Sequence, residues 1–334
     1  MAADTFQSIT IEGFKSIRSI KDLPLRPINI LVGANGSGKS NFLEAFIFLG
    51  AAHSGELDSY VARYGGADKQ LHFGSKTTQR VGVRLKSING LDMSANYTSA
   101  VNDELVGNAT WTGLESSSLT FNRYRFQDTG ENSPLKKTNN LSDNRWLRRL
   151  GGNLAAYLYR LKLQHRESYD QIRKTVQQVA PFFDDFQLEP LALNPDTIKL
   201  EWRHKRSDQY FDASDFSDGT LRFIALATLF LQPVELRPSV ILVDEPELGL
   251  HPFAIGLLAS LIKQASIDTQ VIVATQSPLL LDYFDPEDIL VADRIDGATT
   301  IERKKPEPLA DWLKEYSLGQ LWEKGELEGR PGKE

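Results

Sequence analysis

The spacing of apolar residues predicts that the chain opens with strands and then enters a helix. Short apolar runs at 6–11, 17–20 and 28–32 are typical of strands. Over residues 39–52 the apolar positions recur at the spacing of a helix that has one apolar face. A buried strand, a loop and a helix are therefore expected in that order around residues 28–52.

The middle of the chain alternates between strand-like and polar segments. Residues 54–70 are rich in loop-forming types, and residues 81–126 contain short alternating segments that indicate an antiparallel sheet. The polar stretch 127–143 is predicted to be a loop and the most mobile segment. Residues 144–179 have a helical pattern, which the pair Gly151 and Gly152 interrupts.

The second half of the chain changes pattern once more. Residues 182–211 return to strands, with a turn at 204–208, and helix and strand alternate from Ser217 onward. Such alternation favours a parallel α/β sheet. We expect three segments: an N-terminal lobe over 1–125, a mainly helical insertion over 126–183 and a C-terminal lobe over 184–334.

Composition narrows the class of protein only a little. The chain has 334 residues with a formal net charge of −6, so no overall basic field attracts nucleic acid. It has no cysteine, which excludes disulfides and thiolate metal sites and suits a reducing compartment. No apolar run is long enough to span a bilayer, and the first residues do not read as a signal peptide. We expect a cytoplasmic protein without a membrane partner.

The loop after the third predicted strand carries the strongest chemical signal. Gly33, Gly38, Lys39 and Ser40 fit the phosphate-loop pattern G-x-x-x-x-G-K-[ST]. Glycines allow the backbone to curl so that successive N–H groups face phosphate oxygens, and the helix that follows directs its positive end at the same anion. We expect Lys39 to reach the β- and γ-phosphates of ATP and Ser40 to bind Mg²⁺. The expected nucleotide-binding residues here are Gly33, Ala34, Asn35, Gly36, Ser37, Gly38, Lys39, Ser40 and Asn41.

A second signal lies far downstream, where an apolar strand ends in two acids. Asp244 is expected to complete the Mg²⁺ site with Ser40, and Glu245 to orient or deprotonate the attacking water. Taken alone, the pair is equally well explained as an acidic strand end before a turn. The phosphate loop upstream favours the catalytic interpretation.

A third segment, Ser217-Asp218-Gly219, lies where a helix is predicted to begin. A helix start can bind an anion, but Ser217 or Asp218 can equally serve as an ordinary N-cap. The distance along the chain to Asp244 leaves room for one helix, one loop and one strand, which favours a shared site.

These segments together resemble the ABC-type ATPase heads of the SMC, RecF and OLD class, especially the compact bacterial ATPases near RecF. The resemblance rests on GFKS at 13–16, GANGSGKSN at 33–41, FSDGT at 216–220 and DEPELGLHP at 244–252. It covers about 1–77 and 184–295. It implies an α/β P-loop NTPase fold with an antiparallel β lobe and a short helical insertion.

The resemblance also implies a mechanism. Two heads form an ATP-dependent homodimer in which Ser217 and Gly219 of one copy cap the γ-phosphate bound by the other. Lys15 and Ser16 lie beside the base and ribose. Glu245 then promotes hydrolysis and the dimer opens. Catalytic roles fall on Glu245, Lys39 and Gln276, with ATP and Mg²⁺ as cofactors.

Several positions depart from that pattern. Gln276 occupies the place of the usual switch histidine, where it is expected to sense the γ-phosphate without titrating, or else to be an ordinary polar strand end. Asp218 stands where the family usually has a small residue. Gln70 is one candidate for the glutamine that connects the two lobes in this family. His251 is expected to be either a local helix cap or part of a dimer contact.

The partners remain open at this stage. A basic, aromatic-rich stretch over 145–174 is either a nucleic-acid surface or a solvated helix whose aromatic face packs in the core, and we favour the second interpretation. Residues 203–206 form a second, smaller basic cluster. The chain is expected to act on DNA in repair or recombination, or as the ATPase of an anti-phage system. The alternative is a nucleotide-gated scaffold that holds or releases a separate nuclease or toxin, with little turnover. A transporter subunit is disfavoured by Asn41 and the GFKS hairpin.

Overall fold

The computed structural model describes residues 6–100, 102–112 and 119–327. The contacts between residues divide the chain into two compact units, and each unit is built from segments that are separated along the sequence. Unit 1 comprises residues 1–123, 238–244 and 268–334, and unit 2 comprises residues 124–237 and 245–267. The contiguous three-part division expected from the sequence stays a prediction.

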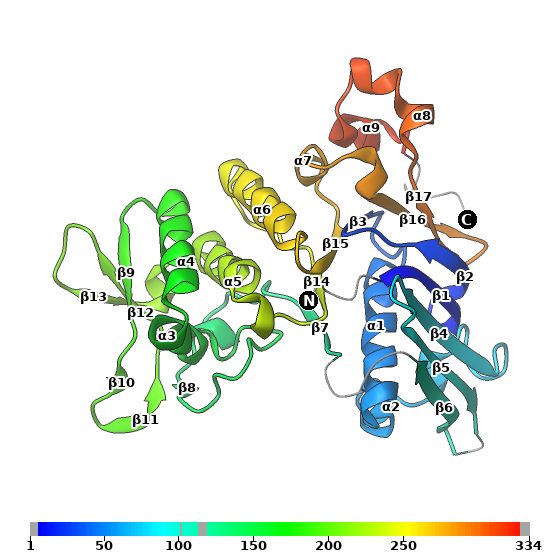
Figure 1. The fold of residues 1–334 in the computed structure, drawn as a ribbon, viewed down its shortest axis with the longest axis horizontal. Helices are drawn as coiled ribbons and strands as arrows, with labels where there is room; N and C mark the ends of the chain where they lie inside the picture. The colour runs from blue at the N-terminus through cyan, green and yellow to red at the C-terminus, as the bar shows by residue number, and fades with distance from the viewer. Residues whose placement is uncertain (1–5, 101, 113–118, 328–334) are drawn as a thin grey trace. The chain divides into compact units, whose positions relative to one another are not determined.

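Unit 1 contains a five-stranded antiparallel sheet in the order β2-β1-β4-β5-β6 (Figure 1). The buried residues of β1 alternate with exposed ones, as expected for a sheet with one face in a core. The strands are β1 (Phe6–Phe14), β2 (Ile17–Pro24), β4 (Arg80–Ser87), β5 (Asp92–Ser99) and β6 (Leu105–Thr112).

A second, six-stranded sheet has the order β17-β16-β3-β15-β14-β7. Strands β16, β3, β15 and β14 are parallel, so their carboxyl ends share one edge. Their near-continuous apolar sequences fit strands that are covered on both faces. The strands are β3 (Ile28–Val32), β7 (Phe121–Tyr124), β14 (Val240–Asp244), β15 (Gln270–Thr275), β16 (Ile289–Ile295) and β17 (Ala298–Arg303).

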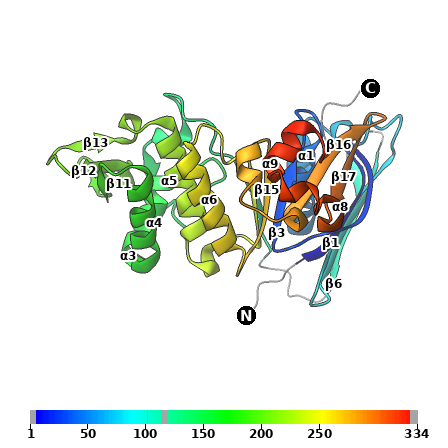
Figure 2. The same ribbon diagram turned by 90° about the horizontal axis from the view of Figure 1, so that it is seen from above.

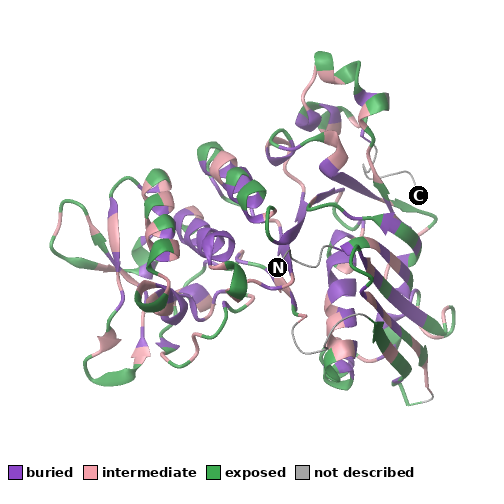
Figure 3. Ribbon diagram, in the orientation of Figure 1, coloured by how far each residue is buried: buried purple, intermediate pink, exposed green. Residues whose placement is uncertain are grey.

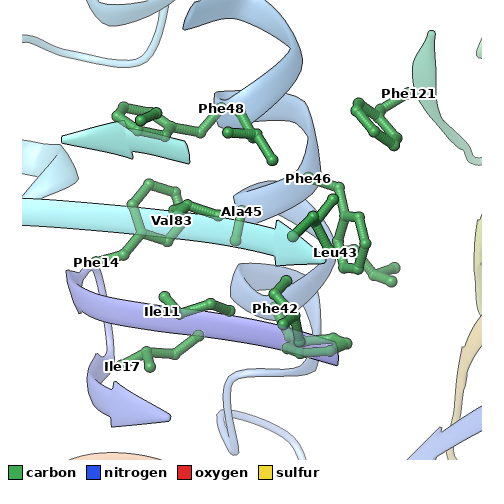
Figure 4. Close-up of a cluster of buried hydrophobic side chains, with 14 of the residues drawn as sticks. Ile11, Phe14, Ile17, Phe42, Leu43, Ala45, Phe46, Phe48, Val83 and Phe121 are labelled. Atoms are coloured by element: carbon green, nitrogen blue, oxygen red, sulfur yellow. The ribbon is translucent and has the colours of Figure 1, made fainter. Parts of the chain in front are cut away.

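Helix α1 (Lys39–Ser54) contributes three phenylalanines to the core of unit 1. Phe42, Phe46 and Phe48 are fully buried, and Figure 4 shows them among side chains of β1, β4 and β7. Apolar residues surround most of this helix, as expected of a helix enclosed by other elements. Unit 1 also holds α2 (Leu57–Arg63), α7 (Pro278–Leu281), α8 (Pro306–Leu309) and α9 (Leu318–Lys324).

Unit 2 is built around α5 (Asp218–Leu231), which is buried along nearly its whole length (Figure 3). Helices α4 (Arg166–Val179) and α6 (Pro252–Ala265) pack against it, and α3 (Leu154–Gln164) packs on α4 (Figure 2). Two small sheets complete the unit, in the orders β13-β12-β9 and β10-β11-β8. Their strands are β8 (Asn139–Asn140), β9 (Phe183–Gln187), β10 (Pro190–Leu191), β11 (Asn194–Ile198), β12 (Glu201–His204) and β13 (Tyr210–Asp212).

Two local expectations were wrong. The segment expected to be loop-rich contains α2, because Leu57, Tyr60 and Val61 bury one face of a short helix. The helical pattern expected over 144–179 begins only at Leu154 and breaks at His165 rather than at the glycine pair. Residues before Leu154 instead form a loop whose backbone bonds to polar side chains.

Candidate functional site

The phosphate loop joins β3 to α1, with Gly38 as the N-cap of the helix. Gly36 and Gly38 have φ angles of 80° and 100°, which side-chain-bearing residues rarely adopt. A Cβ at Gly36 would meet nothing within 4 Å, so the loop has open space on that side. The Lys39 ammonium lies inside the curl, donating to the carbonyl oxygens of Gly33 at 2.6 Å and Ala34 at 2.9 Å.

The carboxyl ends of the parallel strands bring the other predicted residues of unit 1 to the same edge. Val32 is paired with Thr275, and Asp244 with Ala274, in parallel register. The Ser40 hydroxyl donates to Oδ2 of Asp244 at 3.3 Å. Gln276 follows β15 directly and is half-buried. In open α/β sheets, ligands bind at such an edge.

The donor set at this edge fits Mg²⁺ bound together with phosphates. Magnesium in phosphate sites typically takes one or two protein oxygen ligands and completes its shell with phosphate and water. Ser40 and Asp244 supply one hydroxyl and one carboxylate within reach of each other. Among the described residues no group of three or more histidines or acids could bind a metal by itself.

The hairpin between β1 and β2 is bonded directly to the phosphate loop. The Ser16 hydroxyl accepts a hydrogen bond from Asn41 Nδ2 at 2.7 Å and lies 2.7 Å from the Thr299 hydroxyl. Thr299 also lies 2.8 Å from the carbonyl oxygen of Ser37. A side chain at Gly38 would collide with Thr299. Ser16 therefore lies beside the loop as expected, and Thr299 is a member of this group that sequence reasoning missed.

Lys15 occupies a strained position in the same hairpin, with φ of 49°. Its ammonium lies 5.4 Å from the ring centre of Phe14 and 5.2 Å from that of Tyr64. Burial lowers the pKa of Lys15 below its ordinary value, and the negative charge of Glu44 opposes that shift. The rings thus hold the side chain of Lys15 in a defined place.

An ion pair supports the first turns of α1. Arg123 lies 3.2 Å from buried Glu44 and donates to the carbonyl oxygen of Ser40 at 3.3 Å. The Tyr60 hydroxyl donates to the same carboxylate at 3.1 Å, and burial together with Glu44 raises the pKa of Tyr60. No sequence motif marks Glu44 or Arg123, which lie far apart along the chain.

In unit 2, Glu245 forms a second group with a glutamine. Glu245 has a φ of 47°, in the left-handed region where a residue with a side chain is strained. Its Oε2 accepts a hydrogen bond of 2.9 Å from Gln127 Nε2.

Gln70, the candidate taken from the sequence, lies in unit 1. It is fully buried and donates to the carbonyl oxygens of Tyr64 and Gly66. Sequence reasoning missed Gln127, which lies three residues after the end of β7, although a glutamine shortly after a strand was the available signal.

The residues at the start of α5 have structural roles within unit 2 that account for the residue types found there. Ser217 is the N-cap of α5, because its hydroxyl accepts from the backbone N–H of Thr220 at 3.2 Å. A Cβ at Gly219 would lie 2.6 Å from the carbonyl oxygen of Gly249. The exposed Asp218 carboxylate lies 3.8 Å from Lys136.

Arg222 joins three parts of unit 2. This buried side chain donates to the carbonyl oxygens of Phe126 at 3.0 Å, Gln127 at 2.9 Å and Leu248. Burial lowers its pKa from the ordinary value of arginine. Arg222 thus holds the segment that carries Gln127 against α5 and against the turn that follows Glu245.

His251 acts as a local cap of α6, because its ring accepts a hydrogen bond from the backbone N–H of Phe253 at 3.2 Å.

Solved structures of SMC heads share this fold over nearly the whole chain. An SMC head bound to the C-winged helix domain of ScpA aligns with a TM-score of 0.63 at 18% identity, covering 92% of this chain and 99% of that chain. The SMC head domain from Thermotoga maritima aligns with a TM-score of 0.52 at 16% identity, covering 90% and 99%. At these identities the likeness concerns the fold alone. The expected fold is confirmed: a mixed α/β fold that resembles SMC ABC-type ATPase heads, with a parallel sheet and antiparallel lobes.

Shorter stretches resemble curated bacterial proteins. The DNA replication and repair protein RecF of Shewanella denitrificans is 44% identical over 50 residues, which are 15% of this chain and 14% of that protein. RecF of Shewanella baltica is 46% identical over 46 residues, 14% of this chain and 13% of that protein. The match thus spans about one seventh of the length of these relatives.

A family model covers most of the chain. The model of the AAA_21 family, described as "AAA domain, putative AbiEii toxin, Type IV TA system", matches residues 28–282. This range includes the phosphate loop, the Asp244–Glu245 pair and Gln276. The chain belongs to this family of P-loop ATPase domains, which implies nucleotide binding. None of the helices in the described part of the chain combines the length and apolar character that crossing a bilayer demands.

Proposed function

We propose that this protein binds ATP on the loop from Gly33 to Asn41 and hydrolyses it to ADP and phosphate in the presence of Mg²⁺. The observation that carries the proposal is the position of Lys39, whose ammonium lies inside the glycine-rich curl, in the same unit where Ser40 bonds Asp244 at 3.3 Å. A cation inside a loop of N–H groups is suited to a triphosphate. Membership of a P-loop ATPase domain family supports the same conclusion.

Each residue has a defined part in this proposal. Lys39 binds the β- and γ-phosphates, and Ser40 with Asp244 holds the metal. Bound Mg²⁺ neutralises charge on the phosphate oxygens. Glu245 orients or deprotonates the attacking water, which its hydrogen bond from Gln127 helps to position. Gln276 hydrogen-bonds the γ-phosphate and reports its presence without titrating.

We further propose that two copies engage around ATP. Lys15 and Ser16 lie beside the base and ribose of the nucleotide in their own protomer, while Ser217 and Gly219 of the second copy cap the γ-phosphate. The Ser217 hydroxyl accepts a hydrogen bond from the backbone N–H of Thr220 and lies 2.8 Å from the Thr220 hydroxyl. When Thr220 is the donor in that pair, the Ser217 proton can be donated to the γ-phosphate. Engagement would therefore depend on ATP and end with hydrolysis.

The cellular role that we propose is an ATPase acting on DNA in repair or recombination, or in anti-phage defence. The short stretch of identity to proteins named for DNA replication and repair supports the DNA role. The description of the family as toxin-related favours a second candidate, a nucleotide-gated regulator that holds or releases a separate nuclease or toxin with little turnover. A non-self protein partner has a precedent in the SMC head solved with ScpA.

The test of the proposed activity is phosphate release from ATP by the purified chain. We expect turnover with Mg²⁺ and none when EDTA removes the metal, with ATP binding measured separately by calorimetry. Sedimentation velocity with and without ATP then reports engagement of two copies. Binding without turnover would favour the regulator, and indifference to adenine nucleotides in all three measurements would contradict both roles.

A further inference from the structure

The basic and aromatic residues over 145–174 lie in two places in the structure: on helices α3 and α4, and in the loop that precedes α3. Two of the tyrosines of α3 and α4 are core residues: Tyr157 and Tyr169 are fully buried, and their hydroxyls donate to Gln232 at 2.5 Å and Asp185 at 2.6 Å. Basic residues of α4 are paired with acids, as Arg166 is with Asp170 at 3.1 Å. The helices therefore follow the interpretation favoured from the sequence, whereas the loop before them does not.

That loop, residues 143–153 and called the basic loop below, is held rigidly by buried groups. The fully buried Asn153 accepts from the backbone of Arg148 at 2.9 Å and donates to the carbonyl oxygens of Asp143 and Trp146 at 2.9 and 2.8 Å. Arg160 donates to the carbonyl oxygen of Arg145 at 2.7 Å. The backbone is thus fixed before any partner arrives, which lowers the entropic cost of binding.

The side chains that the basic loop presents outward suit stacking and phosphate contact. Trp146 is 55% exposed, although an indole of that size is usually well covered. The Arg145 guanidinium lies 4.8 Å from the centre of the Trp146 ring. Within the described residues, neither Arg145 nor Arg149 has a hydrogen bond or ion pair from its guanidinium, whereas Arg148 bonds Asp143 at 2.7 Å.

A chain of hydrogen bonds leads from the basic loop to the proposed catalytic acid, all within unit 2. The carbonyl oxygen of Arg149 accepts from the backbone N–H of Arg125 at 3.0 Å. Arg125 Nε donates to Gln127 Oε1 at 3.1 Å, and Gln127 Nε2 donates to Glu245 at 2.9 Å. These three bonds join the backbone of the basic loop to the Glu245 carboxylate, so a change at the Arg149 carbonyl on binding would reach the orientation of that carboxylate.

We infer that the basic loop binds single-stranded DNA and that its occupation adjusts Glu245 through Arg125 and Gln127. The Trp146 ring stacks on an unpaired base, and the guanidiniums of Arg145 and Arg149 bind the flanking phosphates. A duplex, whose bases are already stacked, offers no ring face to Trp146. The binding part stands by itself, while the effect on turnover rests on the proposed ATPase function.

The binding test uses fluorescence anisotropy of a labelled oligo(dT) of twenty nucleotides, titrated at several salt concentrations. Replacing both Arg145 and Arg149 by Gln should flatten the slope of log affinity against log salt by about 1.4, since each lost phosphate contact on a single strand accounts for about 0.7. Trp146→Ala should weaken binding roughly tenfold and leave the slope unchanged. The matched control is Lys205→Gln with Arg206→Gln, which removes two exposed charges from another loop of unit 2 and should change neither quantity.

Three outcomes would overturn the binding part. These are duplex DNA binding as tightly as oligo(dT), unchanged affinity in Trp146→Ala, or displacement by poly-L-glutamate at equal charge concentration. The last result would assign the loop to an acidic protein partner. Thermal melting of each variant should match that of the parent chain, since none of the changed side chains is buried.

The coupling test measures ATP turnover with and without saturating oligo(dT). We expect the oligonucleotide to change the rate in the parent chain and to leave it unchanged in Arg125→Ala, which still binds DNA. Equal responses in the two proteins, or no response in the parent chain, would overturn the coupling. A chain that binds oligo(dT) through the basic loop but never hydrolyses ATP would contradict the proposed function and leave the DNA site supported.

Discussion

The phosphate-loop group in unit 1 and the Ser217 segment in unit 2 were both identified by motif, but their surroundings differ. In unit 1 the polar side chains bond to residues that are distant along the chain: Ser40 to Asp244, and Asn41 to Ser16. In unit 2, Ser217 caps its own helix and Gly219 allows a close approach of Gly249. Local structure explains Ser217 and Gly219, whereas Lys39 places a positive charge inside a glycine-rich curl, on the carbonyl oxygens of Gly33 and Ala34.

The difference indicates how variants should behave in the two regions. A residue without a local structural task should affect nucleotide binding or turnover when replaced, with little loss of stability. A residue that also caps a helix or packs against backbone should change stability as well. Measuring both quantities for each variant tests whether the contrast is real.

The largest effect should follow from Lys39→Ala. Two charge-assisted hydrogen bonds to phosphate contribute about 4 kcal/mol together, so ATP affinity should fall by roughly three orders of magnitude. Calorimetric titration measures the affinity, and Lys21→Ala, which removes an exposed lysine of β2, is the control. Tight ATP binding by Lys39→Ala would remove the main support for the phosphate site.

Next in size is the effect of Glu245→Gln on hydrolysis. The amide cannot accept a proton, so the turnover rate should fall roughly a hundredfold or more while ATP stays bound. The lifetime of the ATP-bound dimer should lengthen, as sedimentation or light scattering would show. Glu12→Gln, at an exposed carboxylate of β1, should have neither effect. Normal turnover in Glu245→Gln would assign the catalysis to another group.

Gly219→Ala should mainly cost stability. The added methyl group would lie 2.6 Å from the carbonyl oxygen of Gly249, so the backbone must shift, at a cost of about 1–3 kcal/mol in the free energy of unfolding. Urea denaturation measures this value. In Gly130→Ala the new Cβ would meet only Asp128, at 3.6 Å, and stability should not fall. Equal stability of the two variants would mean that the turn at Gly249 adapts freely.

The smallest effect on stability separates the two tasks of Ser217. Ser217→Ala removes the N-cap and should lower the free energy of unfolding by about 1 kcal/mol. Ser217→Asp keeps a capping oxygen and should retain stability, yet its charge would repel a γ-phosphate and abolish ATP-dependent engagement. If Ser217→Asp still forms the ATP-bound dimer, Ser217 is a cap and nothing more.

Sequence reasoning succeeded where the physical cause is local. The glycine pattern before Lys39 identified a curled loop because positive φ angles at Gly36 and Gly38 are a property of those residues themselves. It failed for Gln127, Thr299 and Arg222, which belong to no motif and matter only through neighbours distant along the chain. The loop before α3 was misassigned because Asn153 draws its backbone carbonyls away from helical hydrogen bonds.

The amino-acid sequence alone determined the fold class, the phosphate loop and the acids that end β14, since periodicity and short motifs encode them directly. Only the tertiary structure decided which polar atoms meet: Ser40 with Asp244, Gln127 with Glu245, and an exposed Trp146 beside buried tyrosines of the same basic stretch. The reason is that hydrogen bonding and burial depend on distances between segments far apart in the chain, and those distances exist only after the sheets and helices have packed.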